Sequence, residues 1–318
     1  MVAADPAFAL DLVCLGEAMV EFNQSRDQPT RYGAGFGGDT SNCAIAAARI
    51  GAKSGYITQL GDDVFGQQLM ALWRDEHVDT TGVRVLPGAE TGVYFVTHGP
   101  QGHAFTYRRA NSAASRMSAD DAAFLPCLQQ AARARTLHVS GISQAISASA
   151  RDTVFAAIAL ARASGARVSY DLNFRPRLWS ADSARPVVER TVAACDIFLP
   201  SIDEAALLAG TRTPQEALQW AHGLGAPTVL LKLGAQGCWV SQRGQVTQLA
   251  PHRVQPVDST GAGDCFAGCL LARLAAGDDI VRAARAANVA AALSTQGFGA
   301  VAPLPTWPQV QAAMTGQA

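Results

Sequence analysis

The stretch Asp258–Phe266, with the sequence DSTGAGDCF, decides the fold. The extended segment Pro251–Val257 precedes it, and apolar residues at helical spacing follow it. We therefore predict that Gly261-Ala262-Gly263 lies at a helix N-terminus, where small residues leave backbone N–H groups accessible. The partial positive charge of a helix N-terminus suits phosphate or a developing anion. Asp264, in the first turn, is either an N-cap after a flexible turn or a functional carboxylate beside that site.

Composition restricts the class of protein. The 318 residues are long enough to bury a substantial core, and 49% of them are apolar while 16% are charged, as in ordinary globular proteins. The net charge of −1 provides no electrostatic footprint for nucleic acid or for an anionic membrane. No basic segment precedes Ala7–Leu15, and no uncharged apolar run reaches about 18 residues. We therefore expect a cytoplasmic protein without a membrane or nucleic-acid partner.

The seven cysteines are scattered, without the spacing of a disulfide framework. Cys265 and Cys269 are four residues apart on the predicted helix, which would also suit a metal pair. No other Cys or His lies near them in sequence, so we interpret both as packing residues.

A glycine run at Gly33–Gly38 matches the pattern G-x-G-x-x-G of dinucleotide-binding proteins. That fingerprint needs a hydrophobic strand directly before it and an acidic residue about 20 positions later. Here polar residues precede the run, and the next predicted strand, Gly55–Leu60, ends without the acid. An NAD-dependent dehydrogenase would rest on this run alone. A helix is predicted over about Asp39–Arg49, with Asp39 as either its N-cap or a ligand contact.

Two segments of the sequence, taken together, are specific to one protein family. The patterns D-S-T-G-A-G-D-x-F-x-G at 258–268 and G-G-D-T-S-N at 37–42 resemble the two signatures of the ribokinase (PfkB) family of sugar kinases. The resemblance implies an α/β fold, namely a three-layer α/β/α sandwich with a mainly parallel sheet. It also implies that Asp264 is the catalytic base and that Gly261-Ala262-Gly263 is the anion hole. No G-x-x-x-x-G-K-[ST] motif occurs, which argues against a P-loop kinase. The predicted sugar contacts are Gly38, Asp39 and Asn42.

Two strands, Val93–Thr97 and Ala104–Arg108, are predicted around a turn at Gly99–Gly102. They interrupt the alternation of strands and helices and resemble the small β-lid that family members fold over the sugar. Tyr94 and Tyr107 would face the sugar, although packing in the core or against another lid explains either tyrosine equally well.

We expect one domain, residues 1–318, with lid segments at about 17–36 and 89–110. The resemblance implies a homo-oligomer that associates through the lid.

Three further segments narrow the resemblance. D-x-N-F-R-x-x-L-W at 171–179, Y-R-R at 107–109 and H-V-S-G-I-S at 138–143 are similar to segments of the 2-keto-3-deoxygluconate kinases of this family. In those enzymes two arginines hold the substrate carboxylate, and the matching residues are Arg175 and Arg108, with Arg109 as an alternative to Arg108. A neutral sugar does not need two guanidinium groups, whereas a sugar acid gains charge-assisted pairing. The alternative for each arginine is a salt bridge to a protein carboxylate.

The resemblance implies that ATP and Mg²⁺ bind at the ends of later strands. Glu204 would act on Mg²⁺ through water, and Ser201 replaces the asparagine that many family members carry. Asp258 and the loop near Phe298 would bind a monovalent cation such as K⁺. The predicted nucleotide contacts are Asn173, Ser201, Lys232, Gly234, Gly237, Gly261, Gly263 and Asn288.

The function expected from this resemblance is ATP-dependent phosphorylation of the terminal hydroxyl of 2-keto-3-deoxygluconate. Another sugar or sugar acid, such as a ketogluconate, fructose or ribose, is the alternative within the family. Two alternatives from other classes are an NAD-dependent dehydrogenase and a non-catalytic sugar sensor on a kinase fold.

Overall fold

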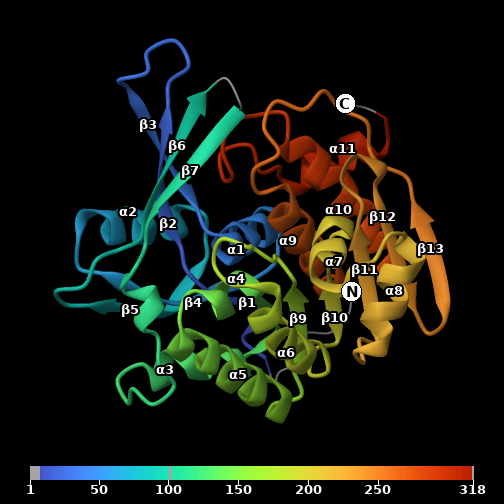
Figure 1. Ribbon diagram of the computed structural model, residues 1–318, viewed down its shortest axis with the longest axis horizontal. Coiled ribbons are helices and arrows are strands. Elements are labelled where there is room, and N and C mark those ends of the chain that lie inside the picture. Colours follow the sequence, from blue (N-terminus) through green and yellow to red (C-terminus); the bar gives the residue numbers. More distant parts are fainter. Residues whose placement is uncertain (1–7, 100–101, 317–318) are drawn as a thin grey trace.

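A nine-stranded sheet is the centre of this computed structural model, which describes residues 8–99 and 102–316 (Figure 1). The strand order is β13-β12-β11-β10-β9-β8-β1-β4-β5, and every neighbouring pair from β11 to β5 is parallel. The strands β12 and β13 add an antiparallel edge. The bounds are β1 Leu10–Leu15, β4 Ser54–Gly61, β5 Asp79–Leu86, β8 Ala134–Ser140, β9 Arg167–Asp171, β10 Ile197–Leu199, β11 Thr228–Lys232, β12 Cys238–Gln242 and β13 Gln245–Leu249.

Helices cover both faces of this sheet. Because side chains alternate along a strand, Leu12 and Cys14 of β1 enter one apolar core while Val13 and Leu15 enter the other. The first core contains α1 Asp39–Arg49, α2 Val64–Asp75, α9 Ala262–Ala275, α10 Ile280–Ser294 and α11 Trp307–Met314. The second contains α3 Leu125–Leu128, α5 Ala148–Ala163, α6 Ala181–Val192, α7 Ile202–Ala209 and α8 Pro214–Gly223, and the short α4 Gly141–Ala145 packs against α5. The expected three-layer sandwich is confirmed, and no helix in the described ranges is long and apolar enough to cross a membrane.

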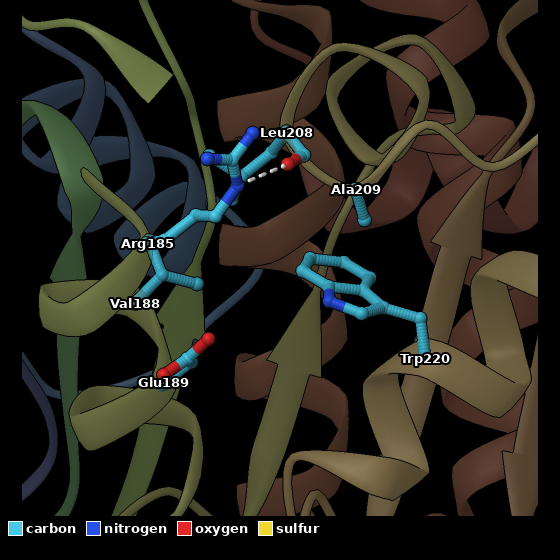
Figure 2. A pocket seen from close by; sticks show the side chains of 6 residues that line it. All are labelled: Arg185, Val188, Glu189, Leu208, Ala209 and Trp220. Carbon is cyan, nitrogen blue, oxygen red and sulfur yellow. Dashed lines mark hydrogen bonds between the residues drawn. The ribbon is translucent and has the colours of Figure 1, made fainter. Parts of the chain in front are cut away.

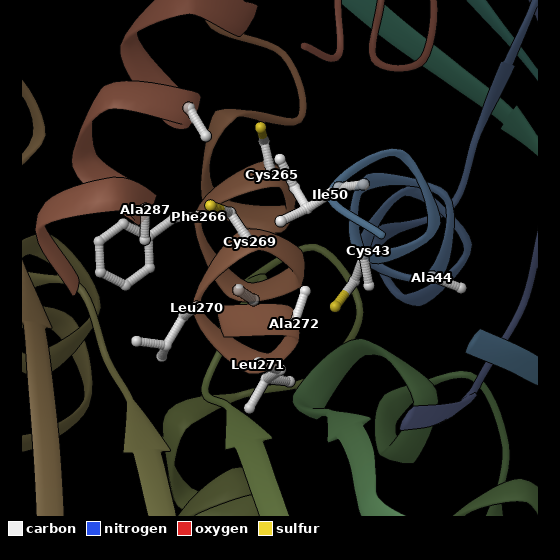
Figure 3. Packing of buried hydrophobic residues seen from close by; sticks show 14 of the residues in the cluster. Cys43, Ala44, Ile50, Cys265, Phe266, Cys269, Leu270, Leu271, Ala272 and Ala287 are labelled. Carbon is white, nitrogen blue, oxygen red and sulfur yellow. The ribbon is translucent and has the colours of Figure 1, made fainter. Parts of the chain in front are cut away.

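The packing of α9 on α1 explains part of the 258–268 signature. Cys265 and Cys269 lie in the core between α1, α9 and α10, as Figure 3 shows, so both cysteines are packing residues. A Cβ atom on Gly268 would lie 2.4 Å from the backbone oxygen of Cys43, so this glycine lets the two helices approach closely. The close approach carries the first turn of α9 to the first turn of α1.

A second sheet of four strands extends from one end of the sandwich, at the upper left of Figure 1. Its order is β3-β2-β6-β7, with β2 and β6 parallel and both outer pairs antiparallel. These strands fall within the two predicted lid segments, while the assignment of the chain to one domain stays a prediction. Residues 100–101 of the predicted turn lie outside the described residues. The bounds are β2 Met19–Gln24, β3 Tyr32–Gly37, β6 Val93–Gly99 and β7 Gly102–Arg108.

The glycine run Gly33–Gly38 ends strand β3 and starts α1, which differs from the strand-turn-helix geometry of a dinucleotide fingerprint. A Cβ on Gly37 would lie 2.3 Å from the Tyr94 hydroxyl. Gly38 has φ +120°, and a Cβ there would lie 2.5 Å from the Glu17 backbone oxygen. Gly37 and Gly38 therefore let this segment of backbone pass close to the Tyr94 side chain and to the backbone of Glu17.

Candidate active site

Polar residues gather where the parallel strands end. Ser140 ends β8, Asp171 ends β9, Lys232 ends β11, and Ser201 follows β10. The carboxyl ends of parallel strands share one edge of the sheet, which is where α/β proteins bind their ligands. The first turns of α1 and α9 reach the same edge and supply Asp39, Asn42 and Asp264.

Asp264 lies in the first turn of α9 but is not its N-cap. The cap is Gly261, whose φ of +76° places it in the left-handed region that favours glycine. The side-chain amide of Asn42 donates to Asp264 Oδ2 at 2.8 Å. Ala262 N–H donates to the Ser259 carbonyl at 3.2 Å, so of the predicted anion-hole donors this one already has a partner in the protein. The N–H groups that follow point out of the helix end, as the geometry of a first turn requires.

The environment of Asp264 suits a base. The residue is half-buried. Burial raises the pKa of Asp264 well above its usual range, and the carboxylates of Asp39 and Asp171 raise it further. The hydrogen bond from Asn42 and the charge of Lys232 act in the opposite direction. A carboxylate with a raised pKa accepts a proton more readily than an ordinary aspartate does.

Asp39 lies beside this group and is also not a helix cap, since Gly38 is the N-cap of α1. Its Oδ2 accepts hydrogen bonds from the Ser140 hydroxyl and from Asn173 Nδ2, the latter at 2.9 Å. Asn173 has φ +37°, a backbone conformation that is rare for residues other than glycine and more common for asparagine. The structure thus connects Asn173, predicted to contact ATP, with Asp39, predicted to contact the sugar.

An ion pair between Asp171 and Lys232 was not predicted. Lys232 Nζ donates to Asp171 Oδ1 at 2.8 Å and to Oδ2 at 2.7 Å, and both side chains are largely buried. A Cβ on Gly263 would lie 3.6 Å from Lys232 Nζ, so the ammonium group sits at the N-terminal turn of α9. The sequence signal that could have indicated this pair is an acid and a lysine, each at the end of a predicted parallel strand.

Glu204 and Ser201 form a capping box at the start of α7, with Ser201 N–H donating to Glu204 Oε2 at 2.9 Å. The other oxygen of Glu204 faces Arg175, whose Nη1 lies 3.4 Å from Oε1. The Arg175 side chain is 51% exposed, and the Glu204 side chain is 9% exposed. Arg175 therefore reaches this edge of the sheet but is held only loosely by a protein carboxylate.

The lid separates the two neighbouring arginines. Tyr94 and Tyr107 are cross-strand partners on one face of the lid, and their rings stack with centroids 5.7 Å apart. Arg108 is the cross-strand partner of Val93, so by strand alternation it lies on the opposite face. Arg109, just beyond β7, lies with its guanidinium 5.8 Å from the centre of the Tyr107 ring. The structure therefore places Arg109, rather than Arg108, on the tyrosine face.

Two buried glutamates support this face of the lid. Arg109 forms an ion pair with Glu17, whose other oxygen accepts from the Ser112 hydroxyl. The Tyr94 hydroxyl donates to Glu21 Oε2 at 2.6 Å, and burial together with the charge of Glu21 raises the pKa of Tyr94. Neither glutamate was a predicted site residue, because only the contacts with Arg109 and Tyr94, which are distant in sequence, place them at this face of the lid.

The predicted nucleotide loop follows β11 and packs on the β12–β13 hairpin. Gly234 and Gly237 have φ of +56° and +88°, and a Cβ on Gly237 would lie 2.2 Å from the Leu249 carbonyl oxygen. Asn288 Nδ2 donates to the carbonyl of Ala250, which directly follows β13, at 3.4 Å. Lys232, the last residue of β11, directly precedes this loop and lies at the N-terminal turn of α9.

Asp258 connects the approach to α9 with the loop near Phe298. Its Oδ1 accepts from the backbone and hydroxyl of Thr260, and its Oδ2 accepts from Gly299 N–H at 3.0 Å. These contacts stabilise the loop that the sequence associates with a monovalent cation.

A cavity of about 220 Å³ lies elsewhere, between α6, α7 and α8 (Figure 2). Arg185 reaches over it and donates to the Leu208 carbonyl at 3.0 Å. None of the predicted site residues lines it, so it is separate from the site described above. Its lining residues are Arg185, Val188, Glu189, Leu208, Ala209 and Trp220.

Proteins of known activity are similar to this chain over most of its length. A 2-dehydro-3-deoxygluconokinase of Thermoproteus tenax is 35% identical over 299 residues, which cover 91% of this chain and 90% of the relative. A 2-dehydro-3-deoxygluconokinase of Dickeya dadantii is 33% identical and covers 94% of this chain and 98% of its own.

Solved structures are similar over the same length. A fructokinase of Vibrio cholerae with fructose, ADP and a potassium ion has a TM-score of 0.84 and 30% identity, with 95% of this chain and 97% of that chain covered. An Escherichia coli protein described as a ribokinase II, with ATP and Mg²⁺, has a TM-score of 0.86 and 28% identity, with 96% and 99% covered. The family of pfkB carbohydrate kinases matches residues 9–307. This chain belongs to the pfkB family of carbohydrate kinases.

Proposed function

We propose that this sugar kinase transfers the γ-phosphoryl group of ATP to the terminal hydroxyl of 2-keto-3-deoxygluconate. The observation that carries the proposal is the carboxylate of Asp264 in the first turn of α9, with its raised pKa and its hydrogen bond from Asn42. The two relatives named above for the same substrate support the choice of sugar acid.

The reaction needs a base and groups that stabilise the negative charge of the transferred phosphoryl group. The sugar hydroxyl oxygen forms a bond to the γ-phosphorus, Asp264 takes the hydroxyl proton, and the bond from the γ-phosphorus to the bridging oxygen breaks to release ADP. The N-terminal turn of α9, with Gly261 and Gly263, faces the charge that develops on the transferred group, and Lys232 adds a cation beside it. Positioning and such preorganised charge supply most of the catalysis in phosphoryl transfer.

The side chains fit a magnesium ion that is held mainly by the nucleotide. Mg²⁺ usually keeps several waters and binds one or two carboxylates together with substrate phosphates. Within residues 8–99 and 102–316 no group of three or more His, Cys, Asp or Glu side chains could hold a metal alone. Glu204 would hold the ion through water, and the bound ion would neutralise phosphate charge. Asp258 is the proposed residue for a K⁺ site.

Arg175 and Arg109 are the proposed readers of the substrate carboxylate. Arg175 is half-exposed at the site edge and only loosely paired, and Arg109 lies on the face of the lid that carries Tyr94 and Tyr107. Arg108 lies on the other face of the lid. We therefore choose Arg109 over Arg108 for the second guanidinium.

A neutral sugar such as fructose is the second candidate substrate. Arg109 and Arg175 already have the protein carboxylates Glu17 and Glu204 as partners, which is the arrangement that a kinase for a neutral sugar would need. The similarity to a fructokinase supports the same alternative.

An acceptor panel separates the two candidates. The purified protein is given MgATP with ketodeoxygluconate, ketogluconate, gluconate, fructose or ribose, and ADP release is measured for each. We expect the highest kcat/KM for ketodeoxygluconate. A preference for fructose or ribose would contradict the sugar-acid proposal, and the absence of turnover with every acceptor, together with tight sugar binding, would support a sensor.

A further inference from the structure

Asp171 is a buried acid of the candidate site that has no role in the chemistry proposed above. It forms an ion pair with Lys232. Both oxygens of Asp171 bind the same ammonium group, at 2.8 and 2.7 Å, and Oδ1 also accepts the backbone N–H of Asn173 at 3.2 Å. The Asp171 side chain is 4% exposed, and the Lys232 side chain is 16% exposed. Two-point binding of a lysine by one carboxylate fixes where the cation lies, which a flexible lysine side chain does not do by itself.

We propose that Asp171 is a positioning residue. It holds the Lys232 ammonium group at the N-terminal turn of α9, where the ammonium binds the phosphoryl group that is transferred. The proposal rests on the phosphoryl transfer proposed above and deepens it. It assigns Asp171 no contact with the substrate; the residue acts through Lys232.

The surroundings show why the lysine needs this partner. Burial lowers the pKa of Lys232, whereas the carboxylates of Asp171, Glu204 and Asp264 raise it, so three acids compete for one cation. Without Asp171 the flexible side chain would turn toward Glu204 or Asp264. Pairing with Asp264 would occupy the proposed base, and pairing with Glu204 would occupy the proposed magnesium residue. Asp171 keeps the cation away from both and close to Gly263.

The position also suits a phosphate. Lys232 Nζ lies close to Gly263, where the helix dipole and the outward N–H groups favour an anion. A phosphate there would meet backbone donors on one side and a fixed ammonium on the other. The lysine would keep its hydrogen bonds to Asp171 while its third donor turns to the phosphate.

A double-mutant cycle tests whether Asp171 acts through Lys232. The variants are Asp171→Asn, Lys232→Met and the double variant, with kcat, the KM for ATP and calorimetric ADP binding as readouts. Each single change should lower kcat/KM for ATP about 10- to 100-fold, as expected for one charge-assisted hydrogen bond. The double variant should equal Lys232→Met within about twofold.

The pair Arg273–Asp278 provides a matched control. It has a similar distance, 2.7 Å, and similar exposure, 15% and 10%, but it lies at the far end of α9 from the site. Asp278→Asn should lower the melting temperature and leave kcat and the KM for ATP unchanged. If Asp171→Asn behaves in the same way, Asp171 is structural and the proposal is wrong.

The pH profile of kcat/KM gives a second readout, because the charges of Lys232 and Asp171 act on the pKa of Asp264 in opposite directions. Asp264 is faced by Asp39 and Asn42 from α1, by Asp171 from β9 and by Lys232 from β11. Loss of the Lys232 cation should shift the acid limb of kcat/KM to higher pH, and loss of the Asp171 charge should shift it to lower pH. Shifts of both variants in the same direction would contradict the assignment.

The result of this double-mutant cycle does not depend on which sugar is the substrate. The cycle uses whichever acceptor gives turnover, and ADP binding needs no acceptor. Independent, multiplying losses in the double variant would overturn the positioning role even if ketodeoxygluconate is the substrate. A coupled cycle with fructose as the best acceptor would support the positioning role and reject the sugar acid.

Discussion

The two ends of the proposed site are held by different parts of the protein. At the phosphoryl end, Asp264, Asp171 and Lys232 lie on the ends of strands and on the first turn of a helix that packs in the core. At the sugar end, Tyr94 belongs to a separate four-stranded sheet and binds Glu21 of that sheet. Arg109 directly follows the last strand of the sheet and pairs with Glu17, which precedes β2. The phosphoryl end is assembled without ligands, whereas under the sugar-acid proposal the arginines of the sugar end would exchange a protein carboxylate for a substrate carboxylate.

The largest expected effect is at the phosphoryl end. Asp264→Asn keeps the shape of the side chain and removes the proton acceptor, and loss of a general base costs about 10²–10⁴ in rate. We expect kcat to fall by this factor while the KM for the sugar changes little. ADP release by the folded variant measures it, with Asp278→Asn, at the far end of α9 from the site, as the control. A wild-type kcat would mean that Asp264 is not the base.

A smaller loss is expected from Arg175→Ala at the sugar end. Loss of one charge-assisted hydrogen bond, about 1.5–3 kcal/mol, should lower kcat/KM for ketodeoxygluconate about 10- to 150-fold. The same change should matter much less for fructose or ribose, which carry no charge for the guanidinium to pair. Equal losses on acid and neutral acceptors would assign Arg175 to the fold or to the nucleotide, and the contrast between the two ends would fail.

The neighbouring arginines of the lid sharpen the comparison further. Arg108→Ala should change kcat/KM less than about twofold, because Arg108 is exposed on the face of the lid opposite Tyr94 and Tyr107. Arg109→Ala should lower both kcat/KM for the sugar acid and the melting temperature, because it leaves Glu17 buried without its cation. Kinetics and thermal unfolding of the two variants decide between them, and a larger kinetic loss for Arg108→Ala would reverse the assignment.

The smallest effect concerns stability. The pKa of Asp264 is raised in the folded state, so its contribution to stability is fully present below the pKa of the unfolded chain and is lost as the pH rises through the folded pKa. Asp264→Asn should therefore have the higher melting temperature at pH 7. The difference should narrow as the pH falls toward the ordinary aspartate pKa of about 4. A variant that is less stable than wild type at pH 7 would show that the charge of Asp264 stabilises the fold.

The start of α9 could be predicted from the sequence because its signals are local. Gly261 requires a left-handed conformation, and the apolar spacing after it defines α9, so the observed start at Ala262 agrees with the prediction. The helix Asp39–Arg49 has the predicted bounds for the same reason. Strand β5 was not predicted, because its polar and exposed residues do not show a buried pattern.

The parts that the sequence did not provide depend on long-range pairing. Which of Arg108 and Arg109 lies on the face of Tyr94 follows from the register of β6 and β7, and a shift by one residue would reverse it. The pair Asp171–Lys232 joins residues 61 positions apart, through the order of β9, β10 and β11 in the sheet. Neither can be read from a motif.

The most direct test of the central claim is the pH dependence of kcat for wild type and Asp264→Asn, measured under saturating ATP and acceptor. If Asp264 is the base, wild-type kcat falls about tenfold per pH unit below a pKa that lies above the ordinary aspartate value, because protonated Asp264 cannot accept the hydroxyl proton. The low residual rate of Asp264→Asn should lack this acid limb. The same acid limb in both proteins would show that another group takes the proton and would contradict the account.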